Sequence, residues 1–191
     1  MKIGLLGGSF DPVHAGHLKL AAAALRQLKL DRVYFVISPM SPFKTDRDLA
    51  PSKLRLAMVR AALKGKKRLL AADWEMKRRG PSYTITTLRG YRRRRPQDEV
   101  HFIFGTDALK GLPRWRKANE IARHATLVAG LRPGATWPRL PKTIAPAVVR
   151  LKGTFPDISS TEIRRALKNG RAARLVPPAA LAILKKHGLY R

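Results

Sequence analysis

Two histidines three positions apart follow a short apolar segment near the N-terminus, in the run Gly7-Gly8-Ser9-Phe10-Asp11-Pro12-Val13-His14-Ala15-Gly16-His17. On a helix that begins near Ala15, His14 and His17 share one face. The N-terminus of a helix presents unpaired N–H groups and a positive dipole, so it binds phosphate readily. Two imidazoles above such a helix end can neutralise charge on a phosphorus centre, and Ser9 adds a hydroxyl donor. This run therefore indicates chemistry on a phosphate group.

The two glycines before Ser9 let the backbone turn tightly and approach a ligand closely. Neither G-x-G-x-x-G nor G-x-x-x-x-G-K-[ST] occurs, which excludes the ordinary dinucleotide-binding and P-loop sites. An isolated H-x-x-H pair is more often incidental than functional. Here the pair stands inside a patterned strand–loop–helix segment, which favours function.

A second hydroxyl-rich segment lies near the C-terminus, in the run Ile158-Ser159-Ser160-Thr161-Glu162-Ile163-Arg164. A helix that starts here offers hydroxyl donors, and one turn later the planar cation of Arg164, to an anion such as a polyphosphate. The simpler interpretation is a Ser N-cap with Glu162 in the first turn. A simple N-cap would explain Ser159 or Ser160. It would not explain why the same chain also carries the histidine motif at residues 7–17.

The elements that position these motifs alternate between strands and helices. Apolar and β-branched runs predict strands at Lys2–Leu6, Arg32–Ile37, Leu69–Trp74, Val100–Phe104, Thr126–Ala129 and Val148–Leu151. Amphipathic segments predict helices at Ala15–Leu28, Ser52–Leu63, Tyr83–Arg93, Arg114–Arg123, Ser160–Lys168 and Ala179–Lys186. Ser52 is a candidate N-cap, and Gly170 a candidate left-handed C-cap. Pro39–Asp48 is expected to be a loop.

This alternation predicts an α/β fold, a Rossmann-like, doubly wound, mostly parallel sheet with helices on both faces. Ligands of such sheets bind beyond the carboxyl ends of the strands, where the strand order reverses. Both motifs follow predicted strands. The length of 191 residues and the absence of a linker predict one domain over residues 1–191.

The composition excludes several classes of site. The chain has no cysteine, which excludes disulfides, thiolate metal sites and thiol nucleophiles. No apolar run is long enough to span a bilayer, and no signal peptide is evident, so we expect a cytoplasmic protein. Forty Lys and Arg residues against twelve Asp and Glu give a formal net charge of +28. These cations are spread along the chain without interleaved aromatics, which argues against a dedicated nucleic-acid surface.

The N-terminal run resembles the (T/S)-F-D-P-x-H-x-G-H signature of the nucleotidyltransferase superfamily, and residues 158–164 resemble its I-S-S-T-x-I-R motif. Further segments resemble the bacterial nicotinate-mononucleotide adenylyltransferase family over essentially the whole chain. They are Glu75-Met76, Gly80-Pro81-Ser82-Tyr83-Thr84, Thr87-Leu88, Gly105-Thr106-Asp107, Leu112-Pro113-Arg114-Trp115, Arg132-Pro133-Gly134, Val176-Pro177 and His187-Gly188-Leu189-Tyr190.

The resemblance implies adenylyl transfer from ATP to nicotinate mononucleotide, with Mg²⁺ carried by the ATP phosphates and no metal ligand from the protein. The implied catalytic residues are His14, His17, Lys44 and Arg164. The implied ATP-binding residues are Gly7, Gly8, Ser9, Phe10, His14, Gly16, His17, Gly105, Asp107, Arg132, Ile158, Ser159, Ser160, Thr161 and Arg164. The implied mononucleotide-binding residues are Ser9, Lys44, Tyr83, Thr84 and Trp115. A C-terminal helical portion from about residue 158 would complete the ATP site, and Asp11 would shape the loop.

Three residues depart from the family pattern. Phe43 replaces a histidine in a P-P-H-K loop that reads Ser41-Pro42-Phe43-Lys44 here, Thr86 replaces an aspartate, and Thr106 replaces a smaller residue. The alternatives left open are nicotinamide mononucleotide or phosphopantetheine as the acceptor, and a basic nucleic-acid-binding protein built on a degenerate nucleotide fold. The sequence does not distinguish a monomer from a homo-oligomer.

Overall fold

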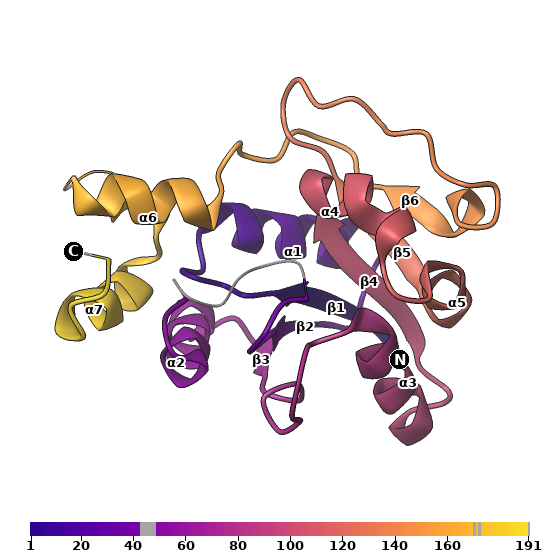
Figure 1. Ribbon diagram of the computed structural model, residues 1–191, viewed down its shortest axis with the longest axis horizontal. Coiled ribbons are helices and arrows are strands. Elements are labelled where there is room, and N and C mark those ends of the chain that lie inside the picture. Colours follow the sequence, from indigo (N-terminus) through magenta and orange to yellow (C-terminus); the bar gives the residue numbers. More distant parts are fainter. Residues whose placement is uncertain (43–48, 170, 172, 191) are drawn as a thin grey trace.

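A computed structural model of the protein describes residues 1–42, 49–169, 171 and 173–190. In this part of the chain six strands form one sheet (Figure 1). They are β1 (Lys2–Gly8), β2 (Arg32–Ile37), β3 (Leu69–Ala72), β4 (Glu99–Gly105), β5 (Thr126–Gly130) and β6 (Val148–Arg150). All neighbours pair in parallel, in the order β3-β2-β1-β4-β5-β6. The predicted doubly wound parallel sheet is therefore confirmed.

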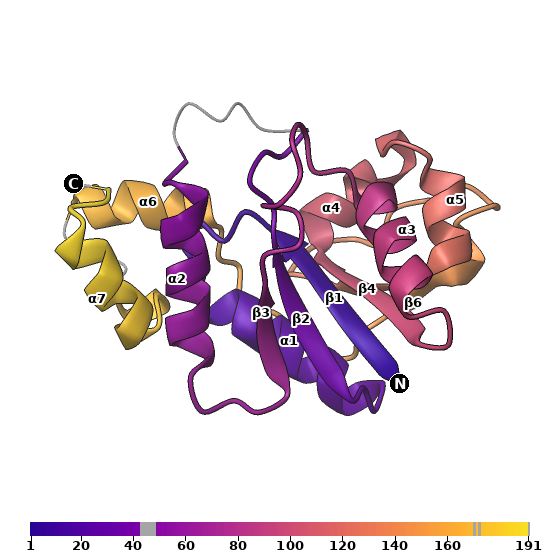
Figure 2. The same ribbon diagram turned by 90° about the horizontal axis from the view of Figure 1, so that it is seen from below.

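Helices cover both faces of this sheet (Figures 1 and 2). They are α1 (Ala15–Gln27), α2 (Ser52–Leu63), α3 (Thr84–Arg94), α4 (Thr106–Gly111), α5 (Ala118–His124), α6 (Ser160–Lys168) and α7 (Pro178–Lys186). One hydrophobic core joins the sheet to α1, α2, α6 and α7. A second core joins the other face to α3, α4 and α5.

The central strand β1 shows why the sheet needs two cores. Its side chains alternate between the faces, so Leu6 enters the first core while Ile3 and Leu5 enter the second. Gly4 lies between these residues with no space for a side chain, because an added Cβ would come within 3 Å of Ile103 and Val33. A continuous apolar run is the expected sequence of a strand buried on both faces.

The strand order reverses at β1, which pairs with β2 on one side and with β4 on the other. The chain leaves β1 toward α1 on one face of the sheet and leaves β4 toward α4 on the other face. A crevice therefore opens beyond the carboxyl ends of β1 and β4. β1 ends at Gly8 and β4 at Gly105, so the glycines of two sequence motifs border this crevice.

The C-terminal helices lie at one side of the molecule, where α7 packs along α2 (Figures 1 and 2). Ala180 and Leu184 of α7 are buried in the first core. The last helices therefore close the same face that α1 covers. No helix among the described residues is long and apolar enough to cross a membrane.

Three local predictions are wrong. The helix expected from Arg114 begins at Ala118, because Lys117 has a left-handed backbone with φ 57° at the N-cap. A separate short helix, α4, precedes it and was not predicted. Ser52 does not cap α2, since Pro51 occupies the N-cap position. Gly170 lies outside the described residues.

Candidate active site

A cavity of about 600 Å³ occupies the crevice beyond β1 and β4. This volume is within the usual range for sites that bind small molecules. Most of the predicted site residues line it together: Gly7, Gly8, Ser9, His14, Gly16, His17, Tyr83, Thr84, Gly105, Asp107, Trp115, Arg132, Ile158, Ser159, Ser160 and Thr161. The fold therefore gathers residues from both ends of the sequence at one place.

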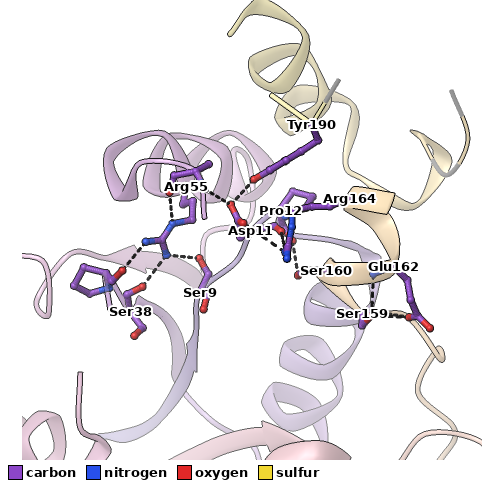
Figure 3. Close-up of polar contacts among 12 residues, drawn as sticks. Ser9, Asp11, Pro12, Ser38, Arg55, Ser159, Ser160, Glu162, Arg164 and Tyr190 are labelled. Atoms are coloured by element: carbon purple, nitrogen blue, oxygen red, sulfur yellow. Dashed lines mark hydrogen bonds and ion pairs between the residues drawn. The ribbon is translucent and has the colours of Figure 1, made fainter. Parts of the chain in front are cut away.

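Of the predicted site residues that the structure describes, Phe10 and Arg164 are not in the cavity wall. Phe10 is buried in the first core, where its ring centroid lies 5.0 Å from that of His17. Arg164 turns toward the loop after β1 and donates a 2.9 Å hydrogen bond from Nη1 to the backbone oxygen of Asp11 (Figure 3). Lys44 lies outside the described residues.

The two histidines stack at the start of α1, with ring centroids 3.6 Å apart. His14 is the N-cap, and its backbone N–H donates to Nδ1 of His17 over 3.2 Å. An imidazole nitrogen that accepts this bond carries no proton. His17 is therefore the tautomer with its proton on Nε2, which makes that nitrogen a hydrogen-bond donor.

His14 is nearly enclosed, with only 4% of its surface exposed. Burial, reinforced by the positive charge of Arg132, lowers the pKa of His14 to about 4. The expectation that both imidazoles supply positive charge therefore changes, because His14 is neutral at neutral pH before a ligand binds. Its Nδ1 is buried without a hydrogen-bond partner among the described residues. Gly16 makes room for this ring, since an added Cβ would lie 3.0 Å from that nitrogen.

Arg132 links three segments at the edge of the cavity. Its guanidinium lies 3.0 Å from the Asp107 carboxylate at the start of α4 and 3.2 Å from that of Asp157. The backbone N–H of Arg132 donates to Thr106 Oγ1 over 2.9 Å. The hydroxyl that Thr106 adds to the family pattern thus fixes the segment that carries Arg132.

The start of α6 combines a helix cap with a wall of the cavity. Ser159 Oγ accepts the backbone N–H of Glu162, and Glu162 Oε2 accepts the backbone N–H of Ser159, which forms a capping box. The hydroxyl of Ser159, which donates to Glu162 Oε2 over 2.6 Å, and the Ser159 backbone N–H hold the pKa of Glu162 below its usual value. Ser160 Oγ donates to the backbone oxygen of Pro12 over 3.0 Å, which ties α6 to the loop before α1 (Figure 3).

The opposite end of the cavity is more aromatic. Trp115 packs its ring edge-on against Phe102, with centroids 6.0 Å apart. The guanidinium of Arg116 lies 4.7 Å from the centre of the Tyr83 ring, and both residues line the cavity. This end offers flat apolar surfaces beside a positive charge.

Glu75 is a buried carboxyl group in the wall near this aromatic end. The hydroxyl of Thr87 donates to Glu75, and Arg78 Nη2 donates to Thr87 Oγ1 over 2.7 Å. Burial raises the pKa of Glu75, although the hydrogen bond from Thr87 opposes that shift. Through Thr87, which belongs to α3, the three residues connect the segment after β3 to the helix that begins at Thr84.

Sequence reasoning missed Glu75, Arg116 and Arg55 as residues of the site or its support. Glu75 lies within a family-like segment, and Arg116 directly follows the segment that ends at Trp115. For these two residues, the neighbouring motif was the available signal. Arg55 gave none, because an arginine on an amphipathic helix is expected on the exposed face. It is 2% exposed and donates to four backbone oxygens, those of Ser9, Ser38, Pro39 and Ala50 (Figure 3).

The other two departures from the family pattern lie away from the cavity wall or outside the described residues. Thr86 is exposed on α3 and does not line the cavity. Phe43 belongs to the segment that is not described. The residues Ser41 and Pro42 just before it do line the cavity.

Residues 5–166 match the cytidylyltransferase-like family. A probable nicotinate-nucleotide adenylyltransferase of Thermus thermophilus is 45% identical over the full length of both chains. One from Dehalococcoides mccartyi strain 195 is 40% identical, covering 100% of this chain and 97% of the relative. The solved structure of Plasmodium falciparum nicotinic acid mononucleotide adenylyltransferase complexed with NaAD superposes with a TM-score of 0.80 at 18% identity, covering 99% of this chain and 97% of the other.

Proposed function

The chain belongs to the cytidylyltransferase-like family and, within it, to the nicotinate-nucleotide adenylyltransferases, and we propose that it transfers the adenylyl group of ATP to nicotinate mononucleotide. The products are deamido-NAD and pyrophosphate, so the enzyme acts in NAD biosynthesis. One observation carries the proposal for this chain. The cavity at the reversal of strand order has helix N-termini and stacked histidines at one end and Tyr83 and Trp115 at the other.

The reaction needs positioning more than acid–base catalysis. An oxygen of the mononucleotide 5′-phosphate attacks the α-phosphorus of ATP, and the bond from that phosphorus to the bridging oxygen breaks as pyrophosphate leaves. The attacking group is already an anion near neutral pH, so no general base is required. The protein must align the two phosphates and stabilise the charge that develops.

The proposed roles divide the cavity into two halves. In the ATP half, His17 donates from Nε2 to the α-phosphate, and neutral His14 adds hydrogen bonds near the leaving group. Ser9, Ser160 and Thr161 supply hydroxyl donors. The remaining ATP contacts come from backbone and side chains of Gly7, Gly8, Gly16, Gly105, Asp107, Arg132, Ile158 and Ser159.

The proposed mononucleotide half uses stacking and charge. The indole of Trp115 stacks on the pyridine ring, and the segment of Tyr83 and Thr84 lines the same end. The guanidinium of Arg116 favours the carboxylate of nicotinate over the uncharged amide of nicotinamide. Lys44 and Arg164 keep their proposed places at the phosphates. For Arg164 to bind phosphate, its guanidinium must either move away from Asp11 or bind the phosphate while it still contacts Asp11.

Mg²⁺ enters this proposal as part of the substrate MgATP. The described residues include no group of three or more His, Cys, Asp or Glu side chains that could hold a metal ion. A site rich in hydrogen-bond donors suits an ion that keeps most of its ligands as water and substrate phosphate. We propose a function in the cytoplasm and propose no nucleic-acid or membrane partner. We also propose that residues 158–190 complete the ATP half of a single domain.

The deciding experiment offers the protein MgATP with one acceptor at a time: nicotinate mononucleotide, nicotinamide mononucleotide or phosphopantetheine. We expect dinucleotide and equimolar pyrophosphate with a strong preference for the nicotinate form. Turnover mainly with phosphopantetheine would assign another acceptor. No turnover, together with nucleic-acid affinity that persists at physiological salt, would favour the binding-protein alternative.

The role of His17 has its own test. Replacing it with alanine should lower kcat by about 100-fold to 1,000-fold, the usual effect of losing one donor to a developing charge. His124 is the control, because it lies at the end of α5 beside Glu120. His124→Ala should turn over normally. Near-normal turnover by His17→Ala, with an unchanged circular dichroism spectrum, would remove His17 from the mechanism.

A further inference from the structure

The penultimate residue of the chain contacts the loop that carries the histidine motif. The hydroxyl of Tyr190 donates a hydrogen bond to Oδ1 of Asp11, 179 residues away in sequence (Figure 3). Asp11 lies between Ser9, at the end of β1, and the histidine pair at the start of α1. A contact between the C-terminus and this loop has no function in the roles proposed above.

Asp11 is a carboxylate in the interior, only 1% exposed. Its Oδ1 also accepts the backbone N–H of Ala50 over 3.2 Å, and its Oδ2 lies 3.5 Å from Nη1 of Arg164. A buried carboxylate needs such partners, because loss of one leaves charge uncompensated away from water. The partners of Asp11 thus decide where the loop lies.

The same contacts continue to the ends of β1 and β2. Ala50, which donates to Asp11, accepts a 2.8 Å hydrogen bond from Nε of Arg55. Arg55 Nη1 in turn donates to the backbone oxygens of Ser9 and Ser38, each over 2.7 Å. A continuous chain of hydrogen bonds therefore runs from Tyr190 through Asp11 and Arg55 to a residue that lines the ATP half of the cavity.

The tail before Tyr190 is itself fixed. Gly188 has φ 60°, and its N–H donates to the oxygen of Lys185, while the N–H of Leu189 donates to the oxygen of Leu184. These bonds form the Schellman motif that ends a helix and sets the direction of the chain after it. Because α7 packs against α2 and the chain after α7 is fixed by these bonds, the position of the Tyr190 side chain is set by the packed helix α7.

Tyr190 remains a hydrogen-bond donor over the whole physiological range. Burial raises the pKa of its phenol, and the hydrogen bond to Asp11 raises it further. The charges of Arg164 and Arg55 act in the opposite direction without restoring the usual value. The phenol of Tyr190 is therefore the donor in this contact.

We propose that Tyr190 is a positioning residue for ATP: through Asp11 it holds the loop between β1 and α1 in the geometry that binds the triphosphate. The proposal rests on the proposed function for the identity of the ligand. It predicts a larger effect on ATP than on the mononucleotide, because the hydrogen bonds from Tyr190 lead to the loop before the histidine pair and include none of Tyr83, Thr84 or Trp115. A contact that only stabilised the fold would affect both substrates or neither.

The test compares two tyrosines with the same chemistry. Tyr91 donates a 2.6 Å hydrogen bond to Asp98, which also binds the N-terminal amine beyond the amino end of the sheet. Removing either hydroxyl by Tyr190→Phe or Tyr91→Phe deletes one tyrosine–aspartate bond. We expect Tyr190→Phe to raise the KM for ATP about tenfold, with the KM for nicotinate mononucleotide changed less than twofold. Tyr91→Phe should lower Tm and leave both KM values unchanged.

Calorimetric titration with MgATP alone separates this proposal from the reaction itself. A dissociation constant that rises about tenfold in Tyr190→Phe supports the positioning role even if no acceptor is turned over, in which case only the proposed function fails. Equal ATP affinity in the wild type and Tyr190→Phe overturns the positioning role. So does an equal rise of both KM values, which would mark a general loss of structure.

Discussion

The two stacked histidines of the motif lie in different local environments although they share one face of α1. His17 lines the cavity and accepts the backbone N–H of His14 at Nδ1, which leaves its proton on Nε2. His14 is kept neutral by burial and by the charge of Arg132. A site that must bind a triphosphate thus holds at least one imidazole uncharged until the anion arrives, and the phosphate itself can then raise its pKa.

The buried state of His14 makes the stability of the free protein depend on pH. Its pKa falls from 6.5 in the unfolded chain to about 4 in the fold, so the unfolded chain binds the extra proton between these values. Stability from this group is fully present above pH 6.5 and is lost as the pH falls toward 4. At about 1.4 kcal/mol per pKa unit, the loss is about 3 kcal/mol.

Urea unfolding of the wild type and of His14→Asn at pH 7 and pH 4 measures this loss. Asparagine keeps the N-cap position occupied by a good capping residue. The difference in unfolding free energy between the two proteins should fall by about 3 kcal/mol over that interval, because the other titrating groups cancel. A difference that does not change with pH would mean that His14 is accessible to protons in the folded state.

Arg116 determines discrimination between the acid and amide substrates if its charge faces the nicotinate carboxylate. Arg116→Gln should lower kcat/KM for nicotinate mononucleotide about twofold to fivefold, since the side chain is exposed and solvent weakens the attraction. The value for nicotinamide mononucleotide should stay constant. Arg150→Gln is the matched control, because that guanidinium packs over Trp137 outside the cavity. Equal losses for both acceptors would assign Arg116 a packing role only.

At the scale of the elements, two glycines inside helices have opposite reasons to be there. In α1, an added Cβ at Gly16 would lie 3.0 Å from Nδ1 of His14. In α3, the nearest atom to an added Cβ at Gly90 is the flexible end of Arg94, 4.0 Å away. A side chain at Gly16 would therefore displace the His14 ring, whereas Gly90 only weakens its helix.

Replacing each glycine with alanine separates these reasons. Gly90→Ala should raise the free energy of unfolding by about 0.5–1 kcal/mol through helix propensity alone, with kcat unchanged. Gly16→Ala gains the same propensity but displaces the His14 ring, so kcat should fall about tenfold or more. The two measurements are urea unfolding and steady-state turnover. Normal turnover by Gly16→Ala would show that the ring can move aside without effect.

The helices and strands that could be predicted from the sequence are those whose conformation follows from the residue types and periodicity of their own segment. The apolar, β-branched runs of β2 and β4 are typical of buried strands, and their parallel order follows from the alternation with helices. The break between α4 and α5 could not be predicted, because it depends on the left-handed backbone of Lys117, a residue with no intrinsic preference for it.

The residues of the candidate site also fall into those that the sequence predicts and those that only the packed structure reveals. Residues inside contiguous motifs, such as His14 and Ser160, were identified because their neighbours carry the pattern. Arg55 lies in no motif, and Tyr190 ends a family-like segment to which the sequence assigned no contact. The contacts of both depend on the packing of α2 and α7 against each other and against the first loop. No spacing along the chain encodes a contact between residues 11 and 190.

At the scale of the whole molecule, the net charge of +28 surrounds a cavity whose substrates are both anions. Arg114, Arg116 and Arg132 line the cavity itself. The basic runs at residues 64–68 and 92–95 lie elsewhere on the surface, so most of the charge cannot touch a bound nucleotide. Charge at such distances acts on encounter rather than on the bound complex, since the field of a protein raises the association rate of oppositely charged ligands.

This reasoning predicts how turnover responds to salt. Between about 10 mM and 300 mM ionic strength the screening length falls from about 30 Å to below 8 Å, so attraction from remote cations disappears. We expect kcat/KM for MgATP to fall about tenfold over that interval while kcat stays constant, because kcat is measured after encounter. Sodium chloride and sodium acetate at equal ionic strength should give the same curve. A decline that depended on the anion would assign the effect to competition inside the cavity, and the remote charges would then contribute nothing to substrate capture.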